Sequence, residues 1–210
     1  MKRREPIFNI TEPTLFAFLG ALIAIHLVRQ LPEIGPAIDK NALLFPFGAE
    51  ADNGQQAFRL IAHGFLHGDG FHLLMNSAMI LIFGLLTLKG TRAKFRNQTI
   101  AVAAFLAIIL VGIVGGGVAQ WAEWEWQNSF GVMLGASGGA SALFAAAGWA
   151  IGGWRHLGIF AAAWAMLNVV MVLFSGTIGN ISWAGHLGGF VAGALIAPLC
   201  VQAFSARKPD

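Results

Sequence analysis

The chain has 210 residues, of which 57% are hydrophobic and only 11% are charged. Soluble domains carry about a quarter charged residues, so this composition excludes a water-soluble globular domain and indicates an integral membrane protein. The single cysteine, Cys200, excludes an intramolecular disulfide and a cysteine-based metal cluster. The isoelectric point near 9.5 does not indicate nucleic-acid binding, because the basic residues fall in short segments between apolar runs.

Apolar runs recur along the whole chain at the length of about 20 residues that a membrane-spanning helix needs. The first run follows a basic start and is longer than the apolar region of a signal peptide, so we expect a retained helix. We therefore predict an all-α polytopic protein with one membrane domain over residues 1–210. Its six helices are expected at about 14–31, 69–88, 98–121, 135–154, 157–174 and 181–204.

The segment before the second helix is the least regular part of this pattern. The apolar run already starts at Phe58, but the stretch "HGFLHGDGFH" interrupts it. We therefore expect the helix to begin near Asp69 and residues 58–68 to form a loop or to lie at the membrane interface. The preceding segment, 32–57, mixes "ALLFPF" with acidic residues, and we expect an outer loop that is partly membrane-associated.

The distribution of basic residues predicts the orientation, because cytoplasmic loops carry an excess of Lys and Arg. With six spans, ten basic residues fall on one side and three on the other, so both termini are predicted to be cytoplasmic. The ten are Lys2, Arg3, Arg4, Lys89, Arg92, Lys94, Arg96, Arg155, Arg207 and Lys208, and the three are Arg29, Lys40 and Arg59.

Three predicted helices carry polar residues at a similar depth. His72 and Asn76 lie four residues apart on the second helix, Ser137 opens the fourth, and His186 lies near the start of the sixth. At 1.5 Å per residue, His72, Ser137 and His186 are ~26, ~27 and ~32 Å from the cytoplasmic charges. Polar groups inside a bilayer are costly and usually functional, so the shared depth predicts a buried site.

Rows of small residues predict that the fourth and sixth helices approach closely. Such an approach would bring Ser137 and His186 to hydrogen-bond distance, which is the minimum arrangement for an activated serine. A structural role stays open for each residue: Ser137 in packing, His186 bonded to a carbonyl, and His72 with Asn76 as an interhelical pair. The small residues near the site are Gly135, Gly138, Ser141, Ala145, Gly185, Gly189 and Gly193.

A metal site or a proton-coupled transporter is the rival interpretation. His63 and His67 lie four residues apart and are followed by Asp69 and His72, and neutral imidazole is a common metal ligand. However, no such group of His and carboxylate residues recurs on another helix, and the chain lacks the paired repeats that are typical of transporters. We therefore expect no metal and no cofactor.

The motifs "HLLMN" at His72–Asn76, "GASG" around Ser137 and "AGHLGG" around His186 occur in this order on alternate helices. Together they resemble the rhomboid family of intramembrane serine proteases, and the resemblance covers about residues 14–204. It implies that Ser137 is the nucleophile and His186 the general base. It also implies that His72, Asn76 and the Ser137 backbone N–H stabilise the oxyanion.

The resemblance also implies the partners of the protein. The substrates would be single-span membrane proteins that are cut in or near their helix and enter from the lipid past the fifth helix. The uncharged loop "SGTIGNISW" at 175–183 is expected to act as a lid. The chain is expected in a bacterial cytoplasmic membrane, in contact with lipid and without nucleic acid.

Two departures from the family pattern concern the surroundings of the site. Phe58-Arg59 stands where the family often has Trp-Arg, and Ser141 stands where many members have an aromatic residue packed on the base. A Phe or Trp from elsewhere would then have to hold the His186 ring. No acidic residue adjoins His186 in the sequence, which indicates a dyad. The alternative function is a catalytically silent rhomboid-like binder of membrane proteins.

Overall fold

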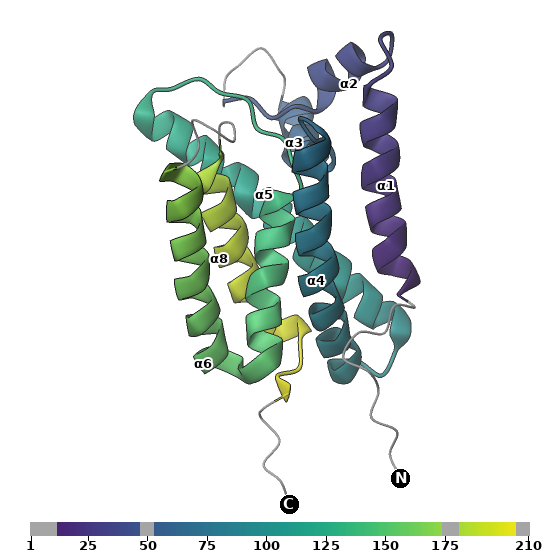
Figure 1. Ribbon diagram of the computed structural model, residues 1–210, viewed down its shortest axis with the longest axis vertical. Coiled ribbons are helices and arrows are strands. Elements are labelled where there is room, and N and C mark those ends of the chain that lie inside the picture. The colour runs from purple at the N-terminus through teal and green to yellow at the C-terminus, as the bar shows by residue number, and fades with distance from the viewer. Residues whose placement is uncertain (1–11, 47–52, 174–180, 205–210) are drawn as a thin grey trace, which may run out of the picture.

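The computed structural model describes residues 12–46, 53–173 and 181–204, and these form an all-α bundle (Figure 1). In the described residues, the β-type backbone pairing consists of one isolated antiparallel bridge between Leu44 and Met133. The predicted fold class is therefore confirmed.

Several predictions concern residues outside these three described ranges. The basic termini at 2–4 and 207–208 and most of the expected lid, 175–180, lie outside the described residues.

Four helices are long and apolar enough to cross a membrane: α4 (Gly70–Lys94), α5 (Gln98–Gln127), α6 (Ser137–Leu173) and α8 (Trp183–Cys200). The helix α6 reverses direction at Gly152 and Gly153, where the backbone is not helical, and its two arms run antiparallel. The shorter apolar helix α1 (Pro13–Arg29) begins with a proline in its first turn, a position that tolerates the missing N–H. Counting the two arms of α6 separately, the described residues contain the six predicted apolar segments.

Two helices extend about six residues beyond their predicted ends, and α8 ends at Cys200, before the predicted residue 204. The helix α4 continues through Lys89, Arg92 and Lys94, which we expected in a loop. Basic side chains are favourable in the last turns of a helix, and a helix that leaves the apolar layer can carry them without being broken. Similarly, α5 extends beyond Trp121 to Gln127 and ends at Asn128, whose left-handed backbone (φ 47°) terminates it.

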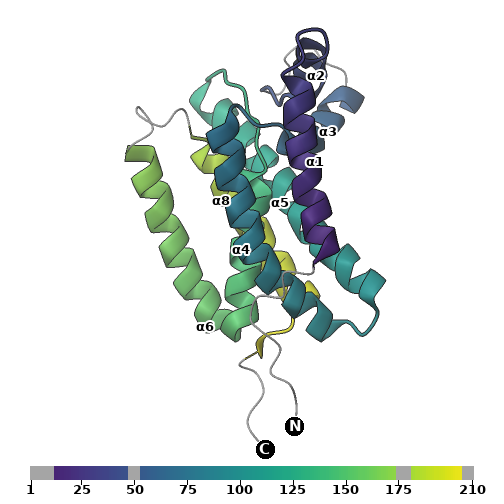
Figure 2. The ribbon, with the colours of Figure 1, turned by 45° about the vertical axis from the view of Figure 1, so that its right-hand side comes forward.

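The segment between α1 and α4, which we expected to be a loop, contains short helices in its described residues. It contains α2 (Gly35–Ala42) and α3 (Asn53–Ala62), followed by the 3-10 turn η1 (His63–Phe65). An ion pair of 2.5 Å joins Arg29 of α1 to Asp39 of α2. These elements cover one end of the bundle, beside the end of α1 (Figure 2).

Arg59, the arginine of the Phe58-Arg59 pair, is buried in the segment between α1 and α4. Its Nη2 donates to the Lys40 carbonyl oxygen at 2.7 Å, and its guanidinium lies 5.0 Å from the centre of the Phe45 ring. Arg59 thereby connects α3 to α2.

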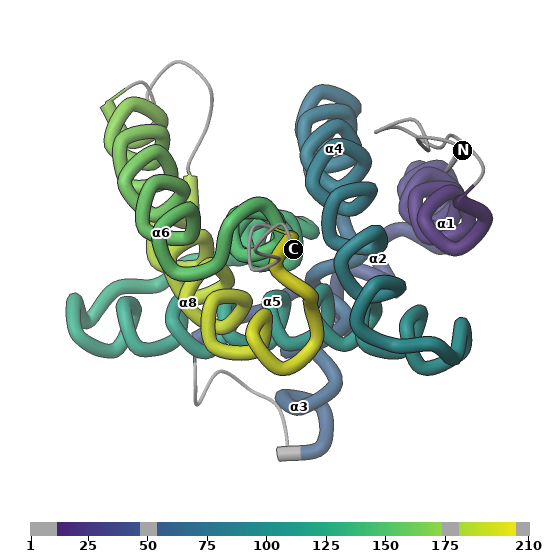
Figure 3. The backbone as a smooth tube through the Cα atoms, turned by 90° about the horizontal axis from the view of Figure 1, so that it is seen from below, coloured from purple at the N-terminus to yellow at the C-terminus, as the bar shows by residue number. Residues whose placement is uncertain are grey.

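The centre of the bundle is formed by α5, α6 and α8, while α1 lies at the edge against α4 (Figure 3). Buried apolar side chains such as Phe105, Ile109 and Leu143 fill the space between α4, α5 and α6. Large apolar residues such as Met166 and Leu195 point outward, as expected for helices that contact lipid.

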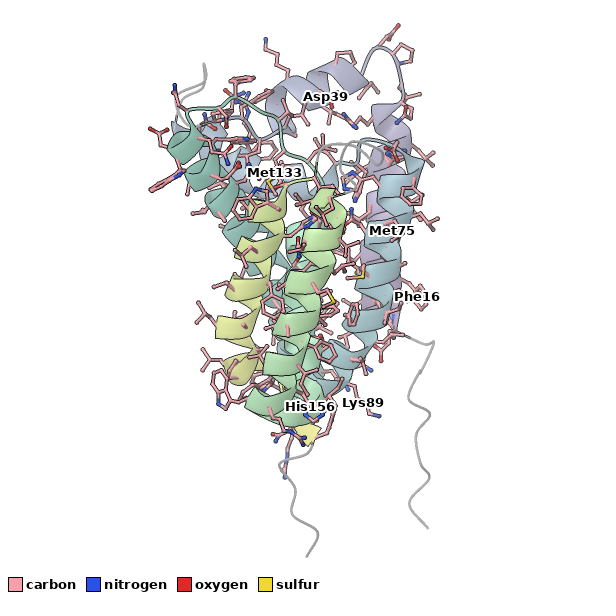
Figure 4. All side chains as sticks on the ribbon, turned by 60° about the vertical axis from the view of Figure 1, so that its left-hand side comes forward. Phe16, Asp39, Met75, Lys89, Met133 and His156 are labelled. Carbon is pink, nitrogen blue, oxygen red and sulfur yellow. The ribbon has the colours of Figure 1, made fainter. Side chains whose placement is uncertain are left out.

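The two ends of the bundle differ in the residues that they carry. Asp39 and Met133 lie at one end, and Lys89 and His156 lie at the opposite end (Figure 4). The described start of α1 and the end of α8 both lie at the Lys89 end (Figure 1). Which end faces the cytoplasm stays a prediction from the basic residues.

Candidate active site

Ser137 is the first residue of α6 and is partly exposed at the end of the bundle that carries Met133. Two contacts fix the segment that leads to it. Met133 pairs with Leu44 through two backbone hydrogen bonds of 2.9 and 3.1 Å, and the Gly135 N–H donates to the His63 carbonyl at 2.9 Å. Gly135 has a positive φ of 122°, which L side chains rarely adopt. The position of Ser137 is therefore set by the backbone.

The start of a helix provides hydrogen-bond donors without an added side chain. The first N–H groups of α6 have no partner within the helix, and the first bond from the α6 side runs from the Ala140 N–H to the Ala136 carbonyl. The N–H groups of Ser137 and Gly138 precede that bond. The helix dipole also favours negative charge at this end.

His72 and Asn76 of α4 lie beside this helix start. A Cβ atom on Gly135 would be 2.8 Å from the His72 Nε2 and 3.8 Å from the Asn76 Nδ2, so both side chains lie against the residue two before Ser137. The Asn76 Nδ2 donates to the His72 carbonyl at 3.1 Å, and only 5% of Asn76 is exposed. The structure thus brings two polar side chains of α4 to the start of α6.

The first turn of α4 holds His72 in place. Asp69 caps this helix, and its carboxylate accepts the His72 backbone N–H at 2.8 Å. This hydrogen bond lowers the pKa of the Asp69 carboxyl and keeps it ionised.

His186 lies in the first turns of α8 and is 8% exposed. Its Nδ1 is 3.0 Å from the Oδ1 of Asn168, and the centre of the Trp164 ring is 6.2 Å from the centre of its own ring. Both neighbours belong to the second arm of α6. Trp164 is thus the aromatic residue beside His186, in the absence of an aromatic residue at position 141.

Glycine contacts bring α6 and α8 together at the level of the site. A Cβ atom on Gly189 would collide with the Gly138 backbone, and one on Gly193 would collide with Ala142. The residues of α6 that these two glycines meet are therefore Gly138 and Ala142. Gly185 instead meets Gly116 of α5, with its carbonyl oxygen 2.7 Å from the position of a Gly116 Cβ.

Ser137 and His186 are neighbours of this glycine contact. Ser137 directly precedes Gly138, and His186 lies three residues before Gly189. The hydrogen bond of the His186 ring goes to Asn168 rather than to Ser137. Catalytic hydrogen bonds are often long before the substrate binds. Ser141 is fully buried, and its hydroxyl donates to the Ser137 carbonyl at 2.7 Å within the helix.

The comparison with family models matches residues 54–203 to the Rhomboid domain. This chain belongs to the rhomboid family. Rhomboid proteins are generally intramembrane serine proteases, and the matched region contains α4, α5, α6 and α8. The apolar helices and the family together identify an integral membrane protein.

Similar proteins occur in mycobacteria. This rhomboid chain is 28% identical over 203 residues to the uncharacterized proteins Mb1372 of Mycobacterium bovis and Rv1337 of Mycobacterium tuberculosis, covering 93% of this chain and 78% of each relative. It is 29% identical over 197 residues to the uncharacterized protein ML1171 of Mycobacterium leprae, covering 89% of this chain and 70% of the relative.

His63 and His67, two of the histidines that suggested a metal site, are fully buried in this rhomboid protein. Burial lowers the pKa of His63 to about 4, and burial with the nearby His72 lowers that of His67 to about 3. Among the described residues, no group of three His, Cys, Asp or Glu side chains is arranged to hold a metal ion. His63 instead accepts the Gly135 N–H through its carbonyl, and its Nδ1 lies 2.9 Å from the Arg59 carbonyl oxygen.

Sequence reasoning did not find the roles of Asn168, Trp164 and His63. Asn168 is an isolated polar residue in an apolar segment, which was a signal, but its partner lies 18 residues away on another helix. His63 acts through its backbone carbonyl, and no side-chain pattern in the sequence can indicate such a contact.

Proposed function

We propose that this rhomboid protein is an intramembrane serine endopeptidase that cuts single-span membrane proteins in or near their helix. The observation that carries the proposal is the position of Ser137. It stands at the start of α6, beside His72 and Asn76 on one side and next to the Gly138–Gly189 contact with α8 on the other.

In the proposed reaction, the Ser137 hydroxyl attacks the carbonyl carbon of the scissile peptide bond. The Nε2 of His186 takes the hydroxyl proton and later gives it to the leaving amine. The acyl-enzyme that remains is then hydrolysed by water, with His186 again acting as the base. His186 is neutral before the reaction in this mechanism, with its hydrogen on the Nδ1 that lies 3.0 Å from the Asn168 Oδ1, so that Nε2 is free to accept the proton.

The negative charge on the tetrahedral intermediate would be stabilised at the start of α6. The backbone N–H of Ser137 has no partner within the helix, and the His72 and Asn76 side chains lie beside it. Donors that are held in place before the reaction lower its barrier, because they need not reorganise as the charge develops. A dyad with these oxyanion donors needs no metal or cofactor.

The substrate class follows from the membrane location of the site. The peptide bonds of a membrane helix are protected by their own hydrogen bonds, so the cleaved segment should contain residues that unwind easily, such as glycine. The mycobacterial relatives support a bacterial cytoplasmic membrane as the location.

A cleavage assay in liposomes tests this proposal. The purified protein is mixed with a model substrate that has one membrane helix, and the products are identified by mass spectrometry. We expect cleavage by the wild type and none by Ser137→Ala or His186→Ala. The matched control is Ser141→Ala, which removes a buried serine four residues away and should preserve most of the activity.

Labelling by a fluorophosphonate probe gives a second reading of the same site. Labelling of Ser137 would identify an activated serine independently of the substrate chosen. A folded wild-type protein that neither cleaves nor becomes labelled would instead favour the catalytically silent binder. Full activity of Ser137→Ala would refute the proposed role of this residue.

A further inference from the structure

Asn168 contacts the candidate base His186 through an amide group whose orientation is fixed. Its Nδ2 donates to the Trp164 carbonyl oxygen at 3.0 Å, one turn earlier in the same helix. Because the amino group is used there, the atom turned toward the His186 Nδ1, at 3.0 Å, is the oxygen Oδ1. The two hydrogen bonds agree with each other only in this orientation of the amide.

An amide oxygen only accepts hydrogen bonds, so the Nδ1 of His186 must carry the hydrogen. In a neutral imidazole the other nitrogen, Nε2, then has a free lone pair. That is the tautomer that a general base needs. In the serine protease triad, the partner of the histidine acts in this way, by holding its tautomer and its orientation.

Trp164 restricts the same ring from a second direction. It is buried, its ring lies 6.2 Å from that of His186, and it also stacks with Phe190 of α8 at 6.5 Å. One turn of α6, Trp164–Asn168, therefore provides both the hydrogen bond and the aromatic contact for His186. Both residues come from the second arm of α6, whereas Ser137 begins the first arm.

We propose that Asn168 is the positioning residue of the base, so that Ser137, His186 and Asn168 work as one unit. This inference rests on the proposed function, in which His186 accepts the Ser137 proton. Asn168 acts through His186, by keeping the hydrogen on Nδ1 and the ring in place. A purely structural asparagine would stabilise the helix contact without controlling the tautomer.

The kinetic test uses Asn168→Leu, which removes the acceptor, and Asn168→Asp, which keeps an acceptor of the same length. We expect Asn168→Leu to lower kcat about 10- to 100-fold, the range for a misplaced catalytic group, with KM changed less than about twofold. Asn168→Asp should recover most of kcat. The control is Met166→Ala, a lipid-facing change on the same arm at a residue that is 71% exposed.

Nitrogen NMR of histidine-labelled protein reads the tautomer directly and needs no activity. The chain has six histidines, and the His186 signals are assigned as those lost in His186→Gln. We expect a protonated Nδ1 and an unprotonated Nε2 in the wild type, and a changed ratio of the tautomers in Asn168→Leu. A wild-type ring with its hydrogen on Nε2 overturns the proposal even if the leucine variant does not fold.

The two proposals fail in different ways. Cleavage by Ser137→Ala at the wild-type rate would refute the proposed function, and with it any role of Asn168 in catalysis. If Ser137 and His186 are essential but Asn168→Leu retains full kcat, only the positioning role is overturned. Equal loss of kcat in Asn168→Leu and Asn168→Asp, with the tautomer unchanged in both, also overturns it.

Discussion

Gly189 of α8 lies directly against the backbone of Gly138 in α6, so the two helices touch there without an intervening side chain. Ser137 directly precedes Gly138, and His186 lies one turn before Gly189. The separation of the proposed nucleophile and base therefore depends on how closely two backbones can approach. A single methyl group at this contact would change it.

We predict that Gly189→Ala lowers both stability and activity. The added Cβ collides with the Gly138 carbonyl and forces the helices apart, at a cost of about 1–3 kcal/mol for an overpacked contact. Cleavage should fall at least about tenfold, because a displacement near 1 Å can cost about 100-fold. Thermal unfolding in detergent and the liposome assay measure the two effects.

The matched control is Gly158→Ala on the second arm of α6, where a Cβ atom would meet nothing within 4 Å. Alanine is the better helix former by up to about 1 kcal/mol, so this variant should be as stable as the wild type or more stable. A Gly189→Ala protein with unchanged stability and activity would contradict the prediction.

Asn76→Ala is predicted to lower kcat about 100-fold and to leave KM nearly unchanged, the typical effect of losing one oxyanion donor. The Asn76 side chain lies against Gly135, two residues before Ser137, and in the proposed mechanism it stabilises the negative charge that develops at the start of α6. The control is Ser77→Ala, the neighbouring residue, whose buried hydroxyl has no hydrogen-bond partner among the described residues. Equal kcat values for Asn76→Ala and Ser77→Ala would remove Asn76 from the proposed oxyanion site.

The stability of the protein is predicted to fall in acid because His63 is buried in its neutral form. The folded protein keeps His63 neutral down to about pH 4, whereas the unfolded chain binds a proton near pH 6.5. Between these values the unfolded state binds more protons than the folded state. The contribution of His63 to the free energy of unfolding is therefore fully present above about pH 6.5 and decreases toward pH 4. The loss for this group is on the order of 3 kcal/mol, and His67 acts in the same direction.

Unfolding of the wild type and of His63→Gln as a function of pH tests this prediction. Glutamine keeps a hydrogen-bonding side chain but does not titrate in this range. The variant should therefore lose less stability than the wild type between pH 6.5 and pH 4. Parallel pH curves for the two proteins would contradict it.

The apolar pattern predicted the fold class and the six apolar segments because hydrophobic length determines what can cross a bilayer. It did not predict that α4 continues through Lys89 and Lys94, since charge marks the edge of the membrane rather than the end of a helix. It also missed α2 and α3, whose short, mixed sequences resemble a loop. Local composition does not determine these features.

In the candidate site, too, some residues could be predicted from the sequence and others could not. Ser137, His186, His72 and Asn76 could be proposed from spacing and motifs, and their catalytic roles stay predictions. Asn168 could not be assigned, because its hydrogen bond to His186 depends on how α6 folds back on itself. The sequence contains the residues of such a contact, but only the packed helices determine which of them meet.

A small rotation of the second arm of α6 about Gly152 and Gly153 would displace residues far along that arm. Asn168 lies fifteen residues beyond Gly153, or ~22 Å along the helix at 1.5 Å per residue. A tilt of about 5° around the two glycines would then move Asn168 by about 2 Å, enough to break its 3.0 Å hydrogen bond to His186. The angle of one helical arm thus determines whether the proposed base is held in place.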